Sequence, residues 1–119
     1  MVGSQYVPER NDIVWLDFEP TKGKEIGKYR PALVLSGKAY NKATGLLICC
    51  PISTSIRGAA TEVPVGNLGK PSVVAANLVM TMDWVQRKVK KKAVAEAGVM
   101  DGVLLRLLPL IGAERLFGV

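Results

Sequence analysis

Pro31 divides residues 21–36, TKGKEIGKYRPALVLS, into two parts that must fold differently. The first part places two glycines among charged residues and is typical of an exposed loop. The second part, residues 32–36, is a short apolar run that predicts a buried strand. Because a proline pushes the residue before it out of the α region, we expect Arg30 to be extended at the mouth of this strand. Loops held by rigid elements often carry binding or catalytic groups, although a solvated hairpin loop has the same composition.

Other short apolar segments bounded by turn residues predict further strands. These strands cover residues 12–18, 46–52, 62–65 and 72–82, the last as two short strands with a bend near Asn77. Pro51 is expected to place the end of its strand at a sheet edge or a bulge, because proline donates no ladder hydrogen bond. Residues 37–44 are polar and predict either a helical turn or a wide connection.

Near the C-terminus the apolar residues change to helical spacing. This spacing runs from Val99 to Ile111, with Asp101 near the start of the predicted helix. Pro109 is expected to kink or end this helix early. About five to seven short strands followed by one helix predict a mainly β chain of the α+β kind, built as a small closed β-barrel. At 119 residues the chain has room for one modest core, so residues 1–119 are expected to form a single domain.

The charge balance of the chain favours an anionic partner. Its formal net charge is +6 and its isoelectric point is near 9.6, while 49% of its residues are hydrophobic. A rich core under a basic surface suggests nucleic acid, and the cations of residues 87–92 (RKVKKK) are either a solvated strand end or a nucleic-acid contact. The sequence has no run of about 18 apolar residues and no apolar N-terminal core, so we expect a cytoplasmic protein with no membrane span.

The residue types of the chain argue against several kinds of site. It contains no histidine, which is the commonest general base and metal ligand in proteins. Cys49 and Cys50 are adjacent, and neighbouring residues of a strand point to opposite faces. A disulfide or a shared metal is therefore not expected, and one cysteine should lie in the core while the other faces elsewhere. We expect no metal site and no cofactor.

Two loops, residues 21–30 and residues 53–61, are together candidates for a catalytic groove. If the strands attached to them are neighbours, Glu25 and Arg30 face Ser53 and Thr54. A carboxylate, a guanidinium and a hydroxyl suit phosphate-ester chemistry, because arginine matches a phosphate with two parallel donors and keeps its charge. By spacing alone this signal is weak, since charged loops beside Ser-Thr loops are common.

A longer pattern of residues extends through both loops. It consists of Asp12-Ile13-Val14-Trp15, Asp17-Phe18-Glu19-Pro20-Thr21-Lys22-Gly23, Glu25, Arg30-Pro31-Ala32-Leu33-Val34-Leu35-Ser36, Tyr40-Asn41 and Pro51-Ile52-Ser53-Thr54. This pattern resembles the MazF/PemK family of toxins, small ribonucleases of toxin–antitoxin pairs, specifically over residues 6–65 and more loosely to about 111. Ser53 stands where the family usually has threonine, and Asn77-Leu78 stands where many relatives carry an Asp-Gln pair. Residues 114–119 have no counterpart.

The resemblance implies a small SH3-like barrel of the CcdB/PemK kind that forms a homodimer and cleaves single-stranded mRNA at short sequences without a metal ion. The RNA 2′-OH attacks its own phosphate and leaves a 2′,3′-cyclic phosphate and a 5′-OH. Glu25, Arg30 and Ser53 fall on catalytic positions: Arg30 stabilises charge, and Glu25 is the base or orients Arg30. Ser53 bonds a phosphate oxygen or only satisfies local backbone. The resemblance also implies a cognate MazE-like antitoxin whose disordered acidic tail blocks the groove.

A track for single-stranded RNA is expected around these catalytic positions. The predicted RNA-binding residues are Lys22, Lys28, Thr54, Arg57, Asn77, Arg87 and Lys88. Tyr29 and Trp84 are candidates for base stacking, although a tryptophan in a small barrel is more often part of the core. Two other functions stay open: a non-catalytic toxin of the same fold that binds a protein target such as DNA gyrase, and a simple RNA-binding barrel.

Overall fold

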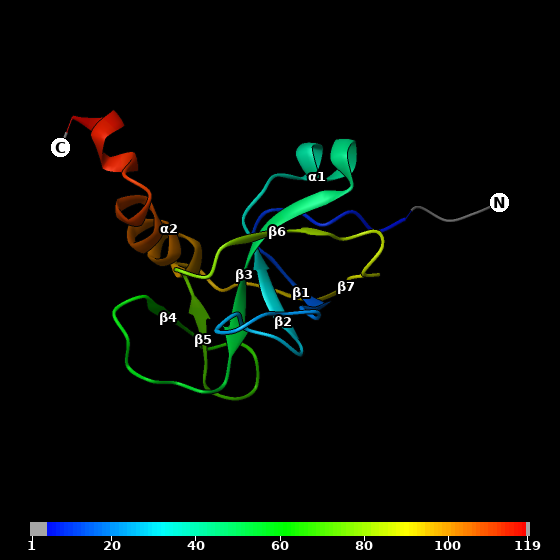
Figure 1. Cartoon of the computed structure of the whole chain (residues 1–119), viewed down its shortest axis with the longest axis horizontal. Helices are drawn as coiled ribbons and strands as arrows, with labels where there is room; N and C mark the ends of the chain where they lie inside the picture. Colours follow the sequence, from blue (N-terminus) through cyan, green and yellow to red (C-terminus); the bar gives the residue numbers. More distant parts are fainter. Residues whose placement is uncertain (1–4, 119) are drawn as a thin grey trace.

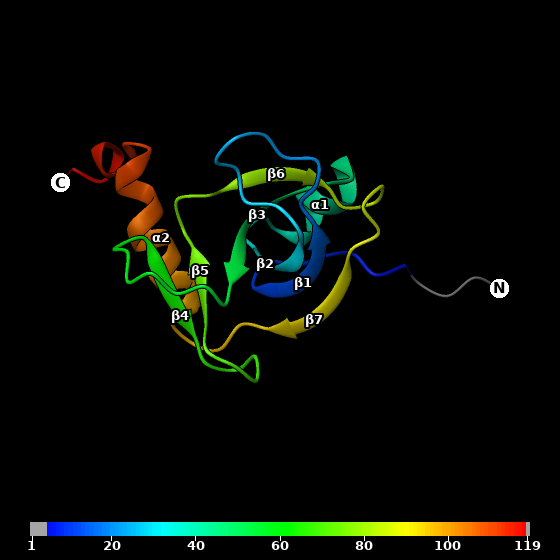
Figure 2. The same ribbon diagram turned by 60° about the horizontal axis from the view of Figure 1, so that its bottom comes forward.

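Seven antiparallel strands form one curled sheet in the computed structural model, which describes residues 5–118 (Figure 1). The strands are β1 (Asp12–Asp17), β2 (Tyr29–Val34), β3 (Leu46–Ser53), β4 (Glu62–Val65), β5 (Ser72–Ala75), β6 (Met80–Asp83) and β7 (Lys90–Val94), and the helices are α1 (Lys38–Thr44), α2 (Val99–Leu110) and the 3-10 helix η1 (Ala113–Phe117). The strand order is β4-β5-β3-β2-β1-β7, and β6 also pairs with β3. Within residues 5–118 the end strands β4 and β7 do not pair, so the sheet is a curled half-barrel (Figure 2). The mainly β (α+β) prediction is confirmed, whereas the expectation of a closed barrel is wrong, because the two end strands do not pair in the described part of the chain.

Most element boundaries agree with the sequence prediction. The bend near Asn77 separates β5 from β6, and residues 37–44 contain the helix α1, which ends at Gly45 with a φ of 73°. Strand β2 begins at Tyr29, three residues earlier than predicted. The reason is its long pairing with β1, which reaches Asp17 opposite Tyr29. Arg30 is therefore a strand residue, extended as Pro31 requires.

Pro51 lies in the middle of the sheet, so the expectation of an edge or a bulge at this residue is wrong. On one side of β3, Pro51 is opposite Ala32 of β2. On the other side, β3 changes partner: its pairing with β6 ends at Cys49 and its pairing with β5 begins at Ile52. Pro51 falls in the gap between these partners, where the strand has no ladder to complete on that side.

The curl of the sheet separates two hydrophobic cores. One contains Ile13, Leu33, Cys50, Ile52, Val63, Val65, Val74, Ala76, Ala95, Val99 and Val103, and the other contains Val14, Leu16, Phe18, Ala32, Val34, Leu47, Cys49, Met82 and Trp84. Because successive strand residues point to opposite faces, neighbours such as Cys49 and Cys50 enter different cores. Both cysteines are fully buried, so the expectation that one faces elsewhere is wrong. Burial raises the pKa of each thiol to about 12, which keeps both protonated at neutral pH.

Helix α2 covers the part of the sheet that contains β4 (Figure 1). Val99, Val103 and Leu107 form its buried face. The helix ends at Leu110, one residue after Pro109. Pro109 was predicted to kink or end the helix, and the helix ends there. Large apolar side chains are exposed on α2 (Leu105 and Leu110), at Ile111 after it, and on η1 (Leu116 and Phe117). Among residues 5–118, no helix has both the length and the apolar character that crossing a membrane would need.

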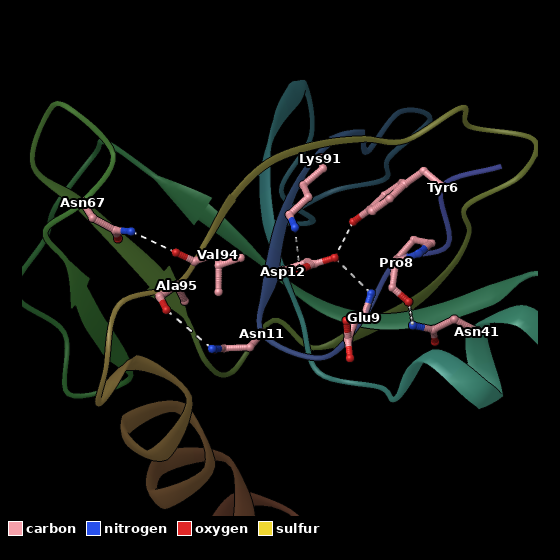
Figure 3. Close-up of polar contacts among 10 residues, drawn as sticks. All are labelled: Tyr6, Pro8, Glu9, Asn11, Asp12, Asn41, Asn67, Lys91, Val94 and Ala95. Atoms are coloured by element: carbon pink, nitrogen blue, oxygen red, sulfur yellow. Dashed lines mark hydrogen bonds and ion pairs between the residues drawn. The ribbon is translucent and has the colours of Figure 1, made fainter. Parts of the chain in front are cut away.

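The N-terminal segment is tied to the sheet by polar groups (Figure 3). Buried Asp12 accepts hydrogen bonds from the Tyr6 hydroxyl (2.6 Å) and the Glu9 amide (3.1 Å), and Lys91 Nζ lies 3.7 Å from its carboxylate. Burial and the Asp12 carboxylate raise the pKa of Tyr6 above its ordinary value, so the phenol stays a donor. Asn41, fully buried, donates to the Pro8 carbonyl (2.8 Å). These contacts hold the segment against the sheet, where Tyr6 and Val7 pack on the second hydrophobic core.

Trp84 is part of the core, and its predicted role in base stacking is wrong. Its side chain is only 5% exposed and packs in the second hydrophobic cluster. Its indole N–H donates to the Asn41 carbonyl at 2.9 Å, which satisfies the one polar atom of the ring.

Candidate active site

The two predicted loops line two neighbouring cavities that share Ser53 and Ser55. The first, here called the Glu25 cavity, has a volume of about 420 Å³ and includes Arg57 and Asn77. The second, here called the Arg30 cavity, has a volume of about 380 Å³; its lining includes Trp15, Lys28, Tyr29, Thr54, Lys70 and Lys92. The tertiary structure therefore brings Glu25, Arg30 and Ser53 into one connected region, with Ser53 between the other two.

Arg30 and Ser53 meet because β2 and β3 are antiparallel neighbours. Ala32 of β2 lies opposite Pro51 of β3, and two residues further along each strand are Arg30 and Ser53. The Arg30 guanidinium is half-buried, and its Nε donates to the Gly27 carbonyl at 2.7 Å. This bond fixes the direction of the side chain, and the two Nη atoms carry four further N–H donors. Arg30 is therefore a preoriented cation at the end of a rigid strand.

Ser53 ends β3, and its hydroxyl already makes a local contact. Its Oγ accepts the Ser55 amide N–H at 3.0 Å, a short turn in which the side chain replaces a backbone acceptor. This is the local backbone role that the sequence left open. A hydroxyl has one donor in addition to its two acceptor sites, so the Ser53 O–H can still donate to a ligand in either cavity.

Glu25 belongs to a tight turn inside the β1–β2 loop. Its carboxylate accepts the Lys22 amide N–H at 2.6 Å, and its own amide donates to the Lys22 carbonyl at 3.1 Å. Within residues 5–118 no ion pair joins Glu25 to Arg30. The group that orients Arg30 in this structure is thus the Gly27 carbonyl. Glu25 presents an exposed carboxylate to the neighbouring cavity.

Glu19 organises the same loop, a role that was not predicted from the sequence. Its carboxylate accepts the Lys28 amide N–H (2.7 Å) and the Thr21 hydroxyl (3.3 Å), which joins the two ends of the loop. Gly27 leaves room for this carboxylate, since a Cβ there would lie 2.3 Å from Glu19 Oε2. The only sequence signal for this contact is a glycine where a charged loop turns back.

Arg87 holds the start of the β1–β2 loop through its backbone. Its Nη1 donates to the carbonyls of Asp17 and Glu19, both at 2.6 Å. Arg87 was predicted to contact RNA, but this geometry places it against the backbone at the start of the loop and outside the lining of both cavities. Its position suggests that it shapes the loop that carries Glu25.

An aromatic pair forms one wall of the Arg30 cavity. The rings of Trp15 and Tyr29 stack with centroids 5.4 Å apart and an interplanar angle of 7°. The ammonium of Lys92 lies 4.6 Å from the Trp15 ring centroid, within the range of a cation–π contact. Tyr29 is 59% exposed, so it has surface free for a further aromatic partner. Stacking was predicted for Tyr29, and Lys92 belongs to the basic run already noted, whereas no role in the site was predicted for Trp15.

The basic run of residues 87–92 does not form one patch. Lys91 is paired with Asp12, Lys92 covers Trp15, and Lys88 lies in a turn with a φ of 52°. Of the predicted RNA-binding residues, four line the two cavities: Lys28, Thr54, Arg57 and Asn77. The other three lie outside both linings: Lys22, Arg87 and Lys88. Among residues 5–118 no three histidine, cysteine, aspartate or glutamate side chains are grouped as metal ligands would be.

Comparisons with known proteins agree on one family. The family described as "PemK-like, MazF-like toxin of type II toxin-antitoxin system" matches residues 9–111. The endoribonuclease toxin MazF of Escherichia coli (strain K12) is 36% identical over 109 residues, which are 92% of this chain and 98% of that protein. The crystal structure of MazF (Form-I) from Deinococcus radiodurans superposes with a TM-score of 0.87 at 41% identity, covering 91% of this chain and 99% of that one. MazF in a MazE–MazF complex (Form-II) from the same organism gives a TM-score of 0.81 at 41% identity, covering 91% and 98%.

Proposed function

This chain belongs to the family of PemK-like, MazF-like toxins of type II toxin–antitoxin systems, and we propose that it is an endoribonuclease that cleaves single-stranded RNA. The observation that carries the proposal is the pairing of β2 with β3, which brings the oriented guanidinium of Arg30 to the hydroxyl of Ser53. A net charge of +6 and an exposed aromatic ring beside these groups suit a single-stranded, polyanionic substrate.

The reaction proposed is an internal transesterification of RNA. The 2′ oxygen attacks the adjacent phosphorus while the bond from phosphorus to the 5′ oxygen breaks, which gives a 2′,3′-cyclic phosphate and a 5′-OH. One proton leaves the 2′-OH and one is delivered to the 5′ oxygen, so the step needs a base, an acid and stabilisation of the phosphorane. No external oxidant, water or metal ion enters the balance.

Arg30 is the group that stabilises the phosphorane. Its guanidinium is a cation whose planar donors match two phosphate oxygens at once. The bond from Nε to Gly27 orders the side chain before substrate arrives, and preorganised donors are usually the largest single contribution to such catalysis. A guanidinium is a poor proton carrier, so the proton steps belong to other groups.

Ser53 and Glu25 complete the proposed site. The free O–H of Ser53 donates to a phosphate oxygen while its Oγ stays bonded to the Ser55 amide. Glu25 supplies a carboxylate in the adjoining cavity and is the candidate base for the 2′-OH. The RNA strand follows both cavities, with Lys28 and Arg57 near phosphates and Tyr29 stacking on a base.

The proposal includes two protein partners. One is a MazE-like antitoxin with a disordered acidic tail, suggested by the MazE–MazF complexes among the similar structures and by the basic charge of this chain. The other is a second copy of the chain. The apolar side chains exposed on α2 and η1, including Leu105 at 73% and Leu116 at 84%, are suited to a two-fold symmetric contact.

Cleavage of a long purified RNA in excess EDTA tests the proposed function. We expect cuts at discrete sites, with 5′-OH ends and cyclic or 3′-phosphate ends, and no cuts by the Arg30→Ala variant prepared in the same way. Ends that carry a 5′-phosphate, or activity abolished by EDTA, would contradict the proposed chemistry. Binding of the RNA without cleavage would instead favour a simple RNA-binding barrel.

A further inference from the structure

Glu62 holds the loop that joins β3 to β4. Its carboxylate accepts three consecutive amide N–H groups, those of Arg57 (3.2 Å), Gly58 (2.9 Å) and Ala59 (3.2 Å). Gly58 has a φ of 73°, a backbone conformation that turns neighbouring amides toward a common point. Glu62 is itself the first residue of β4, paired with Ala75 of β5, so the acceptor is attached to the sheet.

The same loop is fixed at two other places. At its start, the Ser53 hydroxyl accepts the Ser55 amide N–H. At its end, Arg106 of α2 donates from Nε to the Ala60 carbonyl at 3.0 Å, and its Nη1 donates to the Gly102 carbonyl of its own helix at 2.9 Å. Between these points the shape of the loop depends on the Glu62 carboxylate, which binds its three central amides.

This loop forms a wall of the proposed RNA track. Ser55 lines both cavities, and Arg57, Ala59 and Glu62 line the Glu25 cavity. A carboxylate in the lining of a groove for a polyanion is electrostatically unfavourable for binding. Glu62 compensates for this with charge-assisted hydrogen bonds to backbone amides, which order the loop that carries Arg57.

We propose that Glu62 is a positioning residue for RNA binding, which acts by holding residues 57–59 so that Arg57 faces the Glu25 cavity. The role rests on the proposed function. Glu62 makes no contact with the reacting phosphate and takes no part in proton transfer. It lowers the cost of ordering the loop when RNA binds, because the loop is ordered beforehand.

Two substitutions at this position separate positioning from charge. Glu62→Gln and Glu62→Ala both remove the negative charge, but glutamine keeps one oxygen, which can accept two of the three amides. If the acceptor matters, Glu62→Ala should weaken RNA binding about tenfold, while Glu62→Gln should stay within about threefold of the unchanged protein or bind more tightly. Both variants should keep the single-turnover rate at saturating RNA within about twofold, because the interaction acts on binding.

The assay is RNA binding to the full-length protein, with a 2′-deoxy nucleotide at the mapped cleavage position, alongside single-turnover cleavage. Glu9→Ala is the matched control, because its exposed carboxylate lies outside both cavity linings and its loss changes the net charge equally. Amide hydrogen exchange reports on the loop without RNA: Glu62→Ala should accelerate exchange at Arg57, Gly58 and Ala59 and leave β2 and β3 protected.

Equal effects of the two Glu62 variants on RNA affinity would overturn the positioning role, as would tighter binding by Glu62→Ala or unchanged exchange at the three amides. These results would leave the proposed function intact. Failure of the unchanged protein to bind RNA would instead overturn the proposed function, and the role of Glu62 with it. The two failures are therefore distinguishable in one set of measurements.

Discussion

Replacing Arg30 with alanine should slow RNA cleavage far more than it weakens RNA binding. The structure holds Arg30 at the end of β2 opposite Leu16 of β1, with Nε on the Gly27 carbonyl at 2.7 Å. The guanidinium is therefore ordered before the substrate arrives, and little of its effect is lost in reorganisation.

The size of the effect follows from this geometry. Loss of one preorganised donor to a developing oxyanion costs about 10²–10³ in rate, which is about 2.7–4 kcal/mol. Arg30 has two Nη groups that can reach two oxygens and also carries a positive charge, so the loss should be at least this large. Arg30→Lys should recover little of the cleavage rate. One ammonium cannot make the two-pronged phosphate contact while it also bonds to the Gly27 carbonyl.

Single-turnover cleavage of a short RNA is the assay, with binding measured on the same RNA carrying a 2′-deoxy nucleotide at the cleavage position. Lys28→Ala is a matched control, since Lys28 lines the same cavity and its loss removes the same charge. That variant should weaken binding with a smaller salt dependence and leave the single-turnover rate nearly unchanged.

The reasoning is refuted if Arg30→Ala weakens binding about tenfold and leaves the single-turnover rate intact. Arg30 would then be a phosphate anchor, comparable to Lys28, and another group would have to stabilise the phosphorane. Circular dichroism of Arg30→Ala checks that the half-buried side chain is not needed for folding.

Three other predictions concern the surroundings of the site. Gly27→Ala should displace the Glu19 carboxylate from the Lys28 amide and lower the free energy of unfolding in urea by about 1 kcal/mol, with a clear loss of cleavage; full activity would contradict the role of this contact. Tyr29→Ala should weaken RNA binding by about 1–3 kcal/mol while Tyr29→Phe keeps it, and equal losses would show that stacking is not the cause. Ser53→Thr should keep most of the cleavage rate and Ser53→Ala should lose more, because only threonine keeps the hydroxyl; the opposite order in a single-turnover assay would limit Ser53 to its turn with Ser55.

Much of the secondary structure of this protein can be predicted from local sequence patterns, without knowledge of tertiary contacts. Alternating and continuous apolar runs predicted β1 to β6, because the two-residue period of a strand can be read from adjacent positions, whereas the charged strand β7 has no such run. The change to helical spacing predicted α2, and Pro31 predicted that Arg30 is extended. The resemblance over residues 6–65 supplied the family and the candidate residues, and the matched family agrees with it.

The tertiary structure decided the features that depend on which strands are neighbours. Pro51 lies inside the sheet because β3 changes partner at that point, and partner choice has no local signature. Both cysteines are buried because the curled sheet has a core on each face, whereas a flat sheet with one covered face would expose one of them.

The same limit applies to the charged residues. Arg87 and the lysines of residues 90–92 are similar in the sequence but make different contacts. Arg87 holds the start of the loop that carries Glu25. Lys91 pairs with Asp12, Lys92 covers Trp15, and Lys90 is exposed. The contact between Glu62 and the Gly58 amide exists only because the β3–β4 loop folds back on the start of β4. Charge and hydrogen-bonding capacity are properties of a residue, whereas the atom that each group meets is set by contacts between distant segments of the chain.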